Sequence, residues 1–330
     1  MKGIGIVVVS LTALLICASC DHSHSKSPTA RSVEHLRAGT SEIALSSLIW
    51  IAKERGYFAE QGLDIDFKLY ESGHLAVQDL LAGHLDLATA TEFAAVHSFM
   101  DRPDLRIISV LDRAESQQLV ARKDRGITQT ADLRGKRIGL TKGSSAEYYL
   151  HLLLILHDVR LQEVHTIDLL PSEQVKSLGR GDVDAVMVWE PFTAMAKKEL
   201  GANAESWSSQ SGLKDYWLLL STSEVVRKRG RAIQRFLAAL VSAEDFVADN
   251  AAKARRIMQE KLGDKFEDFS WDDHKFSLVL DRTLLLKMEA EIIWLKSILG
   301  SQEFKMPDLM ELIYLDGLKA VRPEKVKMLH

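Results

Sequence analysis

Two glutamates that directly follow apolar runs are well placed to bind a small molecule. Glu190 comes after the run 185–189, in which Trp189 offers an aromatic face beside the carboxylate. Glu92 follows a similar run that ends at Thr91. A carboxylate beside an aromatic ring suits an amine or a heteroaromatic ring through hydrogen bonding, stacking and cation–π attraction. These positions therefore indicate a binding site at the ends of two buried strands, although Trp189 could also belong to the core.

Two serine pairs could bind a negatively charged group of the solute. Ser144 and Ser145 lie just before a segment with helical apolar spacing, and Ser46 and Ser47 hold the corresponding place 98 positions earlier. Hydroxyls and unsatisfied backbone N–H groups at a helix start suit a carboxylate, sulfonate or phosphate. Serines at such positions also commonly cap the helix, and one serine can cap while the other faces the solute. We expect Ser144 or Ser145 to contact the ligand, and Ser46 or Ser47 to make the corresponding contact from the other side of the repeat.

The charges around these positions bear on the kind of solute. Glu147 lies in the first turn of a predicted helix, where it either complements the helix dipole or points inward and repels an anion. Lys142 is the cation next to the serines. Three candidate glutamates against one lysine favour an amine, zwitterion or heteroaromatic ring over an inorganic oxyanion, and a sulfonate-like solute stays compatible. Gly73, through its backbone N–H, and Trp217, as a contact or as a core residue, are further candidates.

Matching residues recur at a separation of 98 positions along the chain. The matched positions include apolar and acidic residues, namely Val77 with Val175, Leu80 with Leu178, Asp86 with Asp184 and Glu92 with Glu190. A sustained internal match predicts two similar α/β lobes that face each other across a cleft. Each lobe would offer a serine pair and a glutamate at the end of a strand.

The pattern along the chain alternates strands and helices and then becomes helical. We predict strands at 33–38, 63–69, 85–90, 105–111, 119–122, 163–169, 185–189 and 216–220, and helices at 45–61, 75–81, 92–100, 145–156, 172–180, 233–247, 251–262, 284–299 and 308–318. Residues 132–140 are predicted to form a short helix, a turn and a further strand. Such alternation favours mostly parallel sheets with ligands at the carboxyl ends of strands. We therefore divide the chain into a first lobe at 33–118, a second lobe at 119–215, and a segment 216–330 that returns to the first lobe and adds helices.

The amino terminus has the pattern of an export signal. A lysine precedes a mostly apolar run over 4–16, which is too short to span a membrane comfortably. The segment ends in Cys17-Ala18-Ser19-Cys20, which resembles a bacterial lipobox in which Cys20 would be lipidated, although Cys17 stands where leucine is usual. The alternative is an ordinary cleaved signal peptide at 1–20. Residues 21–32, rich in Ser and His, are expected to form a flexible tether.

Composition narrows the function classes. The formal net charge of −4 and the lack of a basic run argue against nucleic acid as a partner. Histidines are scattered, and no cysteine follows Cys20, so we expect no metal, no cofactor and no disulfide in the folded part.

Several stretches together resemble a known family. The segments 49–63, 132–139, 181–185 and 189–191 resemble the solute-binding proteins of ABC importers, in the group of nitrate, aliphatic-sulfonate, taurine and thiamine-precursor receptors. The likeness covers about 33–220. It implies an α/β, two-lobed periplasmic-binding-protein type II fold with a helical carboxyl-terminal region, closing on a small polar solute by hinge motion. It also implies delivery to a membrane permease whose ATPase is a separate protein, since the chain has no phosphate-binding-loop motif, and a periplasmic or cell-surface location with a lipid anchor.

Two other functions fit parts of the pattern. A sensory receptor that docks on a signalling partner would bind its ligand by the same physics. An enzyme similar to the pyrimidine synthase of thiamine biosynthesis would share the fold, but its cysteine-rich motif is absent here. We therefore predict a binding protein and not an enzyme.

Overall fold

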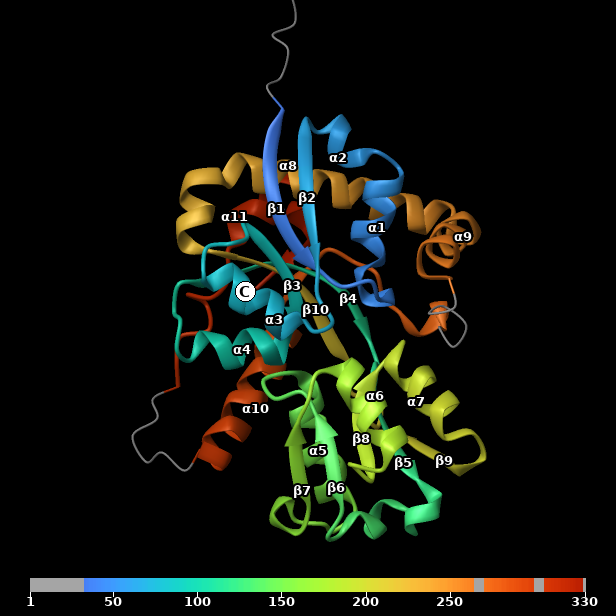
Figure 1. The fold of residues 1–330 in the computed structure, drawn as a ribbon. Coiled ribbons are helices and arrows are strands. Elements are labelled where there is room, and N and C mark those ends of the chain that lie inside the picture. The colour runs from blue at the N-terminus through green and yellow to red at the C-terminus, as the bar shows by residue number, and fades with distance from the viewer. Residues whose placement is uncertain (1–32, 264–269, 300–305, 329–330) are drawn as a thin grey trace, which may run out of the picture. The chain divides into compact units, whose positions relative to one another are not determined.

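The strands form two five-stranded mixed sheets, each flanked by helices (Figure 1). The computed structural model describes residues 33–263, 270–299 and 306–328. The predicted signal segment, Cys20 and the tether 21–32 lie outside the described residues. We call each sheet with its helices a lobe, and residues 33–330 cluster as one unit that contains both lobes.

Lobe 1 has the strand order β2-β1-β3-β10-β4. Its strands are β1 (Glu34–Thr40), β2 (Leu63–Leu69), β3 (Leu87–Thr91), β4 (Leu105–Ala114) and β10 (Asp215–Thr222), and its first helices are α1 (Ser47–Glu54), α2 (Tyr57–Glu60), α3 (Gly73–Leu81) and α4 (Glu92–Phe99). Strand β10 runs antiparallel between β3 and β4, whereas β1 pairs with β2 and β3 in parallel. The chain thus returns to the first sheet after building the second.

Lobe 2 has the strand order β7-β6-β8-β5-β9. It contains β5 (Gln117–Arg122), β6 (Arg137–Leu140), β7 (His165–Asp168), β8 (Ala185–Trp189), β9 (Ala204–Ser208), α5 (Ser145–Leu156), α6 (Pro171–Arg180) and α7 (Phe192–Leu200). Strand β8 is buried along its whole length. Met187 packs in one apolar cluster and its neighbours Val186 and Val188 pack in another. A strand covered on both faces needs a continuous apolar run, which is the pattern in the sequence.

The internal match of 98 positions corresponds to matching structure. Strands β3 and β8 start 98 residues apart, and so do helices α1 and α5. The carboxylate of Asp86 accepts a hydrogen bond of 2.8 Å from the backbone N–H of Arg37, and Asp184 accepts one of 2.9 Å from that of Arg137. The same acidic residue therefore ties together the same two parallel strands in each lobe.

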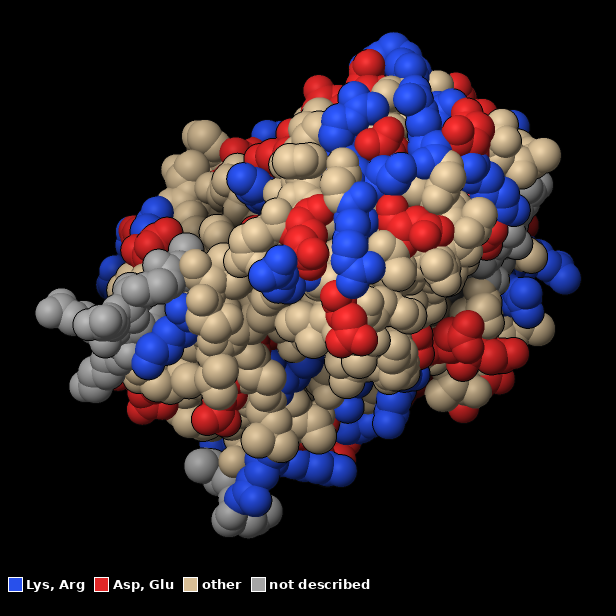
Figure 2. Space-filling model, turned by 90° about the horizontal axis from the view of Figure 1, so that it is seen from below, with Lys and Arg blue, Asp and Glu red and all other residues tan. Residues whose placement is uncertain are grey.

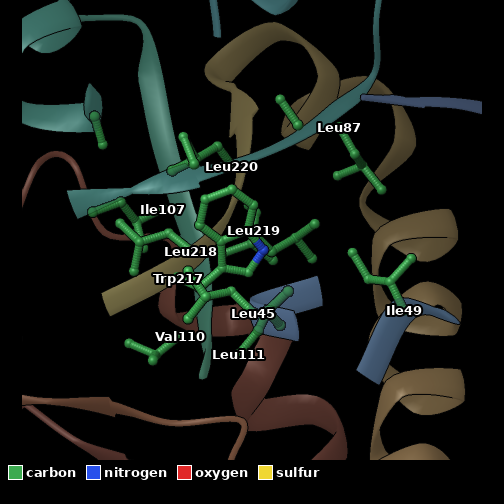
Figure 3. Close-up of a cluster of buried hydrophobic side chains, with 14 of the residues drawn as sticks. Leu45, Ile49, Leu87, Ile107, Val110, Leu111, Trp217, Leu218, Leu219 and Leu220 are labelled. Carbon is green, nitrogen blue, oxygen red and sulfur yellow. The ribbon is translucent and has the colours of Figure 1, made fainter. Parts of the chain in front are cut away.

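The carboxyl-terminal helices extend the core of lobe 1. They are α8 (Ser223–Asp249), α9 (Ala251–Leu262), α10 (Arg282–Leu299) and α11 (Leu315–Val321), with a small sheet of β11 (Leu280–Asp281) and β12 (Val326–Lys327). Figure 3 shows part of this core, where Trp217 of β10 lies among leucines of β10 and side chains of β4.

Three predicted helices are wrong in extent, and the one predicted at 233–247 begins ten residues earlier, at Ser223. The helix predicted at 45–61 breaks at Gly56, whose φ of 74° ends α1 and starts α2. The helix predicted at 308–318 begins only at Leu315. The backbone N–H of Ile107 bonds to the Leu312 carbonyl at 2.7 Å, and that of Tyr314 bonds to the Ile107 carbonyl at 2.9 Å. Pairing with the strand β4 thus takes up the groups that a helix would need.

The charged side chains are mixed in sign on the face that Figure 2 shows. This mixing agrees with the small net charge of the sequence. Among the helices of the described residues, none is both long and apolar enough to cross a membrane.

Candidate functional site

A narrow pocket, whose space for the centres of water-sized molecules is about 20 Å³, is lined by residues of both lobes. Lobe 1 contributes one group of lining residues, namely Ser41, Ile43, Leu45, Ser72, Gly73, His74, Thr91 and Trp217. The other group comes from lobe 2 and the segment that enters it, namely Ser116, Gln117, Ser144, Ser145 and Trp189. The wall therefore combines small polar side chains, one imidazole and two indole rings.

Three helices begin at this pocket. Helices α3, α4 and α5 start directly after the lining residues Ser72, Thr91 and Ser144. None of these three side chains makes a capping hydrogen bond to its helix. The first N–H groups of a helix have no partner within it and carry partial positive charge. Three converging helix starts thus make the pocket suited to an oxyanion.

Several polar atoms of the wall have no protein partner. Within the described part of the chain, the hydroxyls of Ser41 and Ser72, the Nδ1 atom of His74 and the Oε1 atom of Gln117 are buried without a hydrogen bond. Leaving buried polar groups unpaired costs about 1–3 kcal/mol each. A bound polar molecule would supply the missing partners, so these atoms mark where it makes its hydrogen bonds.

The indole of Trp217 is held in place from behind. Its Nε1 donates to the Ser46 hydroxyl at 3.1 Å, and this hydroxyl also hydrogen-bonds with that of Thr40 at 3.1 Å. Leu45 lines the pocket together with Trp217 and belongs to the same buried apolar cluster, part of which Figure 3 shows. A fixed aromatic ring and aliphatic neighbours give the pocket an apolar part beside its polar atoms.

The residues predicted from the sequence divide into two sets. The pocket wall includes Gly73, Thr91, Ser144, Ser145, Trp189 and Trp217. The pocket wall does not include Ser46, Ser47, Glu92, Glu147 and Glu190. Ser46 supports Trp217, and the Ser47 hydroxyl donates to the Ala44 carbonyl at 2.6 Å. The first-lobe serine pair therefore braces the local backbone and one wall of the pocket.

The glutamates Glu147 and Glu190 bond to nearby backbone. Glu147 accepts a hydrogen bond of 3.0 Å from the N–H of Gly143, and Glu190 accepts one of 3.1 Å from that of Ala194. Glu190 lines an adjoining pocket that also includes Glu115. The comparison of three glutamates with one lysine, which favoured an amine as the solute, therefore does not describe the wall of the pocket between the lobes.

The third glutamate, Glu92, belongs to a buried charged cluster beneath the pocket. Lys287 of α10 approaches Glu92 at 3.2 Å and Glu291 at 2.6 Å, and the Glu92 carboxylate also accepts from the N–H of Tyr216 at 2.7 Å. Burial, followed by the repulsion of Glu291, raises the pKa of Glu92 to about 8. Burial alone would lower the pKa of Lys287, but the two carboxylates raise it above its ordinary value. One ammonium therefore compensates two buried carboxyl groups.

The two lobes meet closely at His74. A Cβ added to Gly143 of lobe 2 would lie 2.7 Å from Cε1 of His74, so the imidazole packs against bare backbone. Nε2 of His74 hydrogen-bonds with the Gln78 amide at 2.9 Å. Burial and the neighbouring His97 lower the pKa of His74. The imidazole is therefore held mostly neutral at neutral pH, where one ring nitrogen can donate a hydrogen bond.

A family model that covers more than half of the chain decides its classification. The model described as NMT1/THI5 like matches residues 46–254. The chain belongs to the NMT1/THI5-like family. This confirms the family resemblance seen in the sequence.

Curated relatives of this NMT1/THI5-like chain are binding proteins by name. A protein of Brucella abortus (strain 2308), named only as a binding protein, is 28% identical over 223 residues, which are 66% of this chain and 68% of that protein. A Bacillus subtilis (strain 168) protein, provisionally named an aliphatic sulfonates-binding protein, is 25% identical over 201 residues, which are 59% of this chain and 60% of that protein.

Solved structures share the fold. The alkanesulfonate-binding protein SsuA from Xanthomonas axonopodis pv. citri, solved with MOPS bound, superposes with a TM-score of 0.70 at 18% identity, over 86% of this chain and 99% of that one. The desulfurization enzyme DSZB superposes with a TM-score of 0.60 at 18% identity, over 88% and 99%. The two-lobed binding-protein fold is thus confirmed, and the fold by itself serves both binding proteins and an enzyme.

Sequence reasoning missed part of the wall of this NMT1/THI5-like pocket. The missed polar residues are Ser41, Ser72, His74, Ser116 and Gln117. Ser72 had a local signal, since serine just before a helix start is a common cap residue. Ser41 and Ser116 occupy loops, Gln117 a strand start and His74 the first turn of α3, and none of them belongs to a periodic apolar pattern. In the described ranges, no group of three or more His, Cys, Asp or Glu side chains is placed to hold a metal ion.

Proposed function

We propose that the protein is an extracytoplasmic receptor that binds a small organic sulfonate in the pocket between its lobes and delivers it to an ABC importer. The observation that carries this proposal is the set of unpartnered hydroxyls of Ser41 and Ser72 beside the starts of α3 and α5. The names of the relatives and of the SsuA neighbour support it.

The polar side of the pocket suits the sulfonate group. A sulfonate has three oxygens that accept hydrogen bonds and keeps its charge at every physiological pH. Hydroxyls from both lobes and the N–H groups at helix starts can surround such a group without a basic side chain. Among the described residues, no lysine or arginine lines the pocket, so dipoles and hydrogen bonds would compensate the charge.

The apolar side of the pocket suits the organic part of the solute. Trp189 comes from lobe 2, and Trp217 and Leu45 come from lobe 1. A short alkyl or aryl group between these side chains would gain about 25 cal/mol for each Å² of apolar surface removed from water. Since the two walls belong to different lobes, both contacts form together only when the lobes are closed, which favours the closed state.

The proposal also covers where the protein is found and which protein receives the solute. Export and lipidation at Cys20 would hold the receptor at a membrane surface, where a diffusing solute can be captured and passed to a permease. The resemblance of 1–20 to a lipoprotein signal supports this placement.

Isothermal titration calorimetry of the purified protein with ethanesulfonate tests the proposal. We expect Ser41→Ala and Ser72→Ala each to weaken binding about 10- to 150-fold, since each removes one hydrogen bond to a charged group, worth about 1.5–3 kcal/mol. Ser242→Ala is the matched control, because this hydroxyl bonds within α8 to the Ala238 carbonyl at 3.3 Å. Equal affinities for all four proteins would remove Ser41 and Ser72 from the site.

A further inference from the structure

A buried carboxyl group lies directly behind the pocket wall. Asp215, the first residue of β10, is fully buried. Its carboxylate accepts hydrogen bonds from the Ser116 hydroxyl and, at 3.3 Å, from Nε2 of Gln117. The same Nε2 also donates to the Ser116 hydroxyl at 3.1 Å. Both residues that contact Asp215 line the pocket.

The amide oxygen of Gln117 is consequently the end of this side chain that is left to meet a bound solute. Nε2 is engaged by Asp215 and Ser116, while Oε1 accepts no hydrogen bond from any described residue. An amide oxygen only accepts hydrogen bonds, and a sulfonate also only accepts them. The arrangement with an ionised Asp215 therefore opposes an oxyanion at this position.

We propose that Asp215 selects which end of the Gln117 amide faces the solute, and that a bound sulfonate is accompanied by a proton on Asp215. A protonated Asp215 donates to Oε1 of Gln117, which turns Nε2 toward the pocket as a donor for the sulfonate. Ionised Asp215 instead keeps Nε2 for itself. The proposal rests on the proposed function, because it concerns the same pocket and the same class of solute.

The surroundings of Asp215 allow it to hold a proton near neutral pH. The groups that face it are Glu92 of α4, Lys287 and Glu291 of α10, Tyr149 of α5, and the hydroxyls of Ser116 and Ser145. Burial, followed by the repulsion of Glu92, raises the pKa of Asp215 to about 7, although Ser116, Lys287 and Ser145 act against this rise. An anion bound nearby would raise it further.

The backbone around Gln117 is fixed, so only its amide needs to turn. Its N–H donates to Oε1 of Gln210 at 2.7 Å, and its carbonyl accepts from the Ser209 hydroxyl at 3.0 Å. Both of these partners are buried. Rotation about the last side-chain bond exchanges oxygen and nitrogen without moving the strand.

Proton uptake gives the proposal a measurable consequence. A group with a pKa near 7 is mostly protonated at pH 6 and mostly ionised at pH 8. If only the protonated form binds the sulfonate, the affinity is about tenfold higher at pH 6 than at pH 8, and binding at pH 8 takes up close to one proton. The affinity falls as the pH rises because the bound state holds more protons than the free state.

Calorimetry of the full chain with ethanesulfonate at pH 6 and pH 8, in buffers of different ionisation enthalpy, tests the proposal. We expect proton uptake in the wild type and in His74→Gln. We expect none in Asp215→Asn, whose affinity should be independent of pH. Gln117→Met, which removes the amide, should weaken the pH dependence to what the charge of the bound anion alone produces, and it replaces Asp215→Asn if that variant does not fold.

The outcomes separate this inference from the proposed function. Sulfonate binding without proton uptake would overturn the inference alone, as would uptake that persists in Asp215→Asn. Uptake that is lost in a His74→Gln variant that still binds ethanesulfonate would overturn it as well and assign the proton to His74. A lack of binding at both pH values would overturn the proposed function and this inference with it.

Discussion

We predict that Gly143→Ala disturbs the contact between the lobes and thereby weakens solute binding, in addition to lowering the stability of the fold. The new Cβ would lie 2.7 Å from the His74 ring, about 0.7 Å closer than the 3.4 Å at which ordinary contact begins. His74 lines the pocket, so relieving this overlap displaces a pocket wall or holds the lobes apart. Overpacking of this kind costs about 1–3 kcal/mol. Because this energetic cost applies only when the lobes are closed, the substitution should weaken ethanesulfonate binding by about 5- to 150-fold.

Gly126→Ala is the matched control for this prediction. Gly126 has a φ of 73° and Gly143 a φ of 71°, so alanine suffers the same backbone strain at both positions, about 1–2 kcal/mol. A Cβ on Gly126 meets no atom within 4 Å. Urea unfolding should therefore show a loss of stability in both variants, while calorimetry should show weaker binding only in Gly143→Ala. Equal binding by both variants would refute the proposed role of the His74 contact.

Three further predictions concern other parts of the molecule. Lys287→Met should lower the free energy of unfolding by about 3–5 kcal/mol, since it leaves buried carboxyl groups without their cation; a loss below about 1 kcal/mol in urea unfolding would speak against this. Trp189→Ala should weaken ethanesulfonate binding in calorimetry, whereas Glu190→Ala, outside the pocket wall, should change it less than about twofold; equal effects would show that the wall is placed incorrectly. Cys20→Ala should move the protein from the membrane to the supernatant fraction, and continued sedimentation with membranes would exclude a lipid anchor at this residue.

The architecture was accessible from the sequence because its signals are local or repeated. The run 185–189 is apolar at every position because β8 is buried on both faces. The separation of 98 positions between Asp86 and Asp184 reflects the same strand-linking contact in each lobe. Ser144 and Ser145 lie at the start of α5, which was predicted from its helical spacing. Each of these patterns depends only on residues close together in the sequence or on the internal repeat, so it can be recognised without knowing the tertiary structure.

The direction of the glutamate side chains was not accessible in this way. Glu92 faces Lys287, and this pairing joins residues 195 positions apart in the chain. Glu147 bonds to the backbone of Gly143, a contact that depends on how the preceding loop turns. The charge-based preference for an amine solute therefore rested on positions along the chain, whereas the pocket wall depends on tertiary contacts.

The most direct test of the central claim compares two ligands of similar size and opposite charge. Calorimetric titration of the full chain with ethanesulfonate and with ethylamine, at pH 6 and at low salt, measures whether the pocket selects an oxyanion or a cation. We predict saturable one-to-one binding of ethanesulfonate and no heat of binding for ethylamine, because the described residues of the wall offer helix starts and hydroxyls but no carboxylate. Saturable binding of ethylamine without binding of ethanesulfonate would contradict the proposed function.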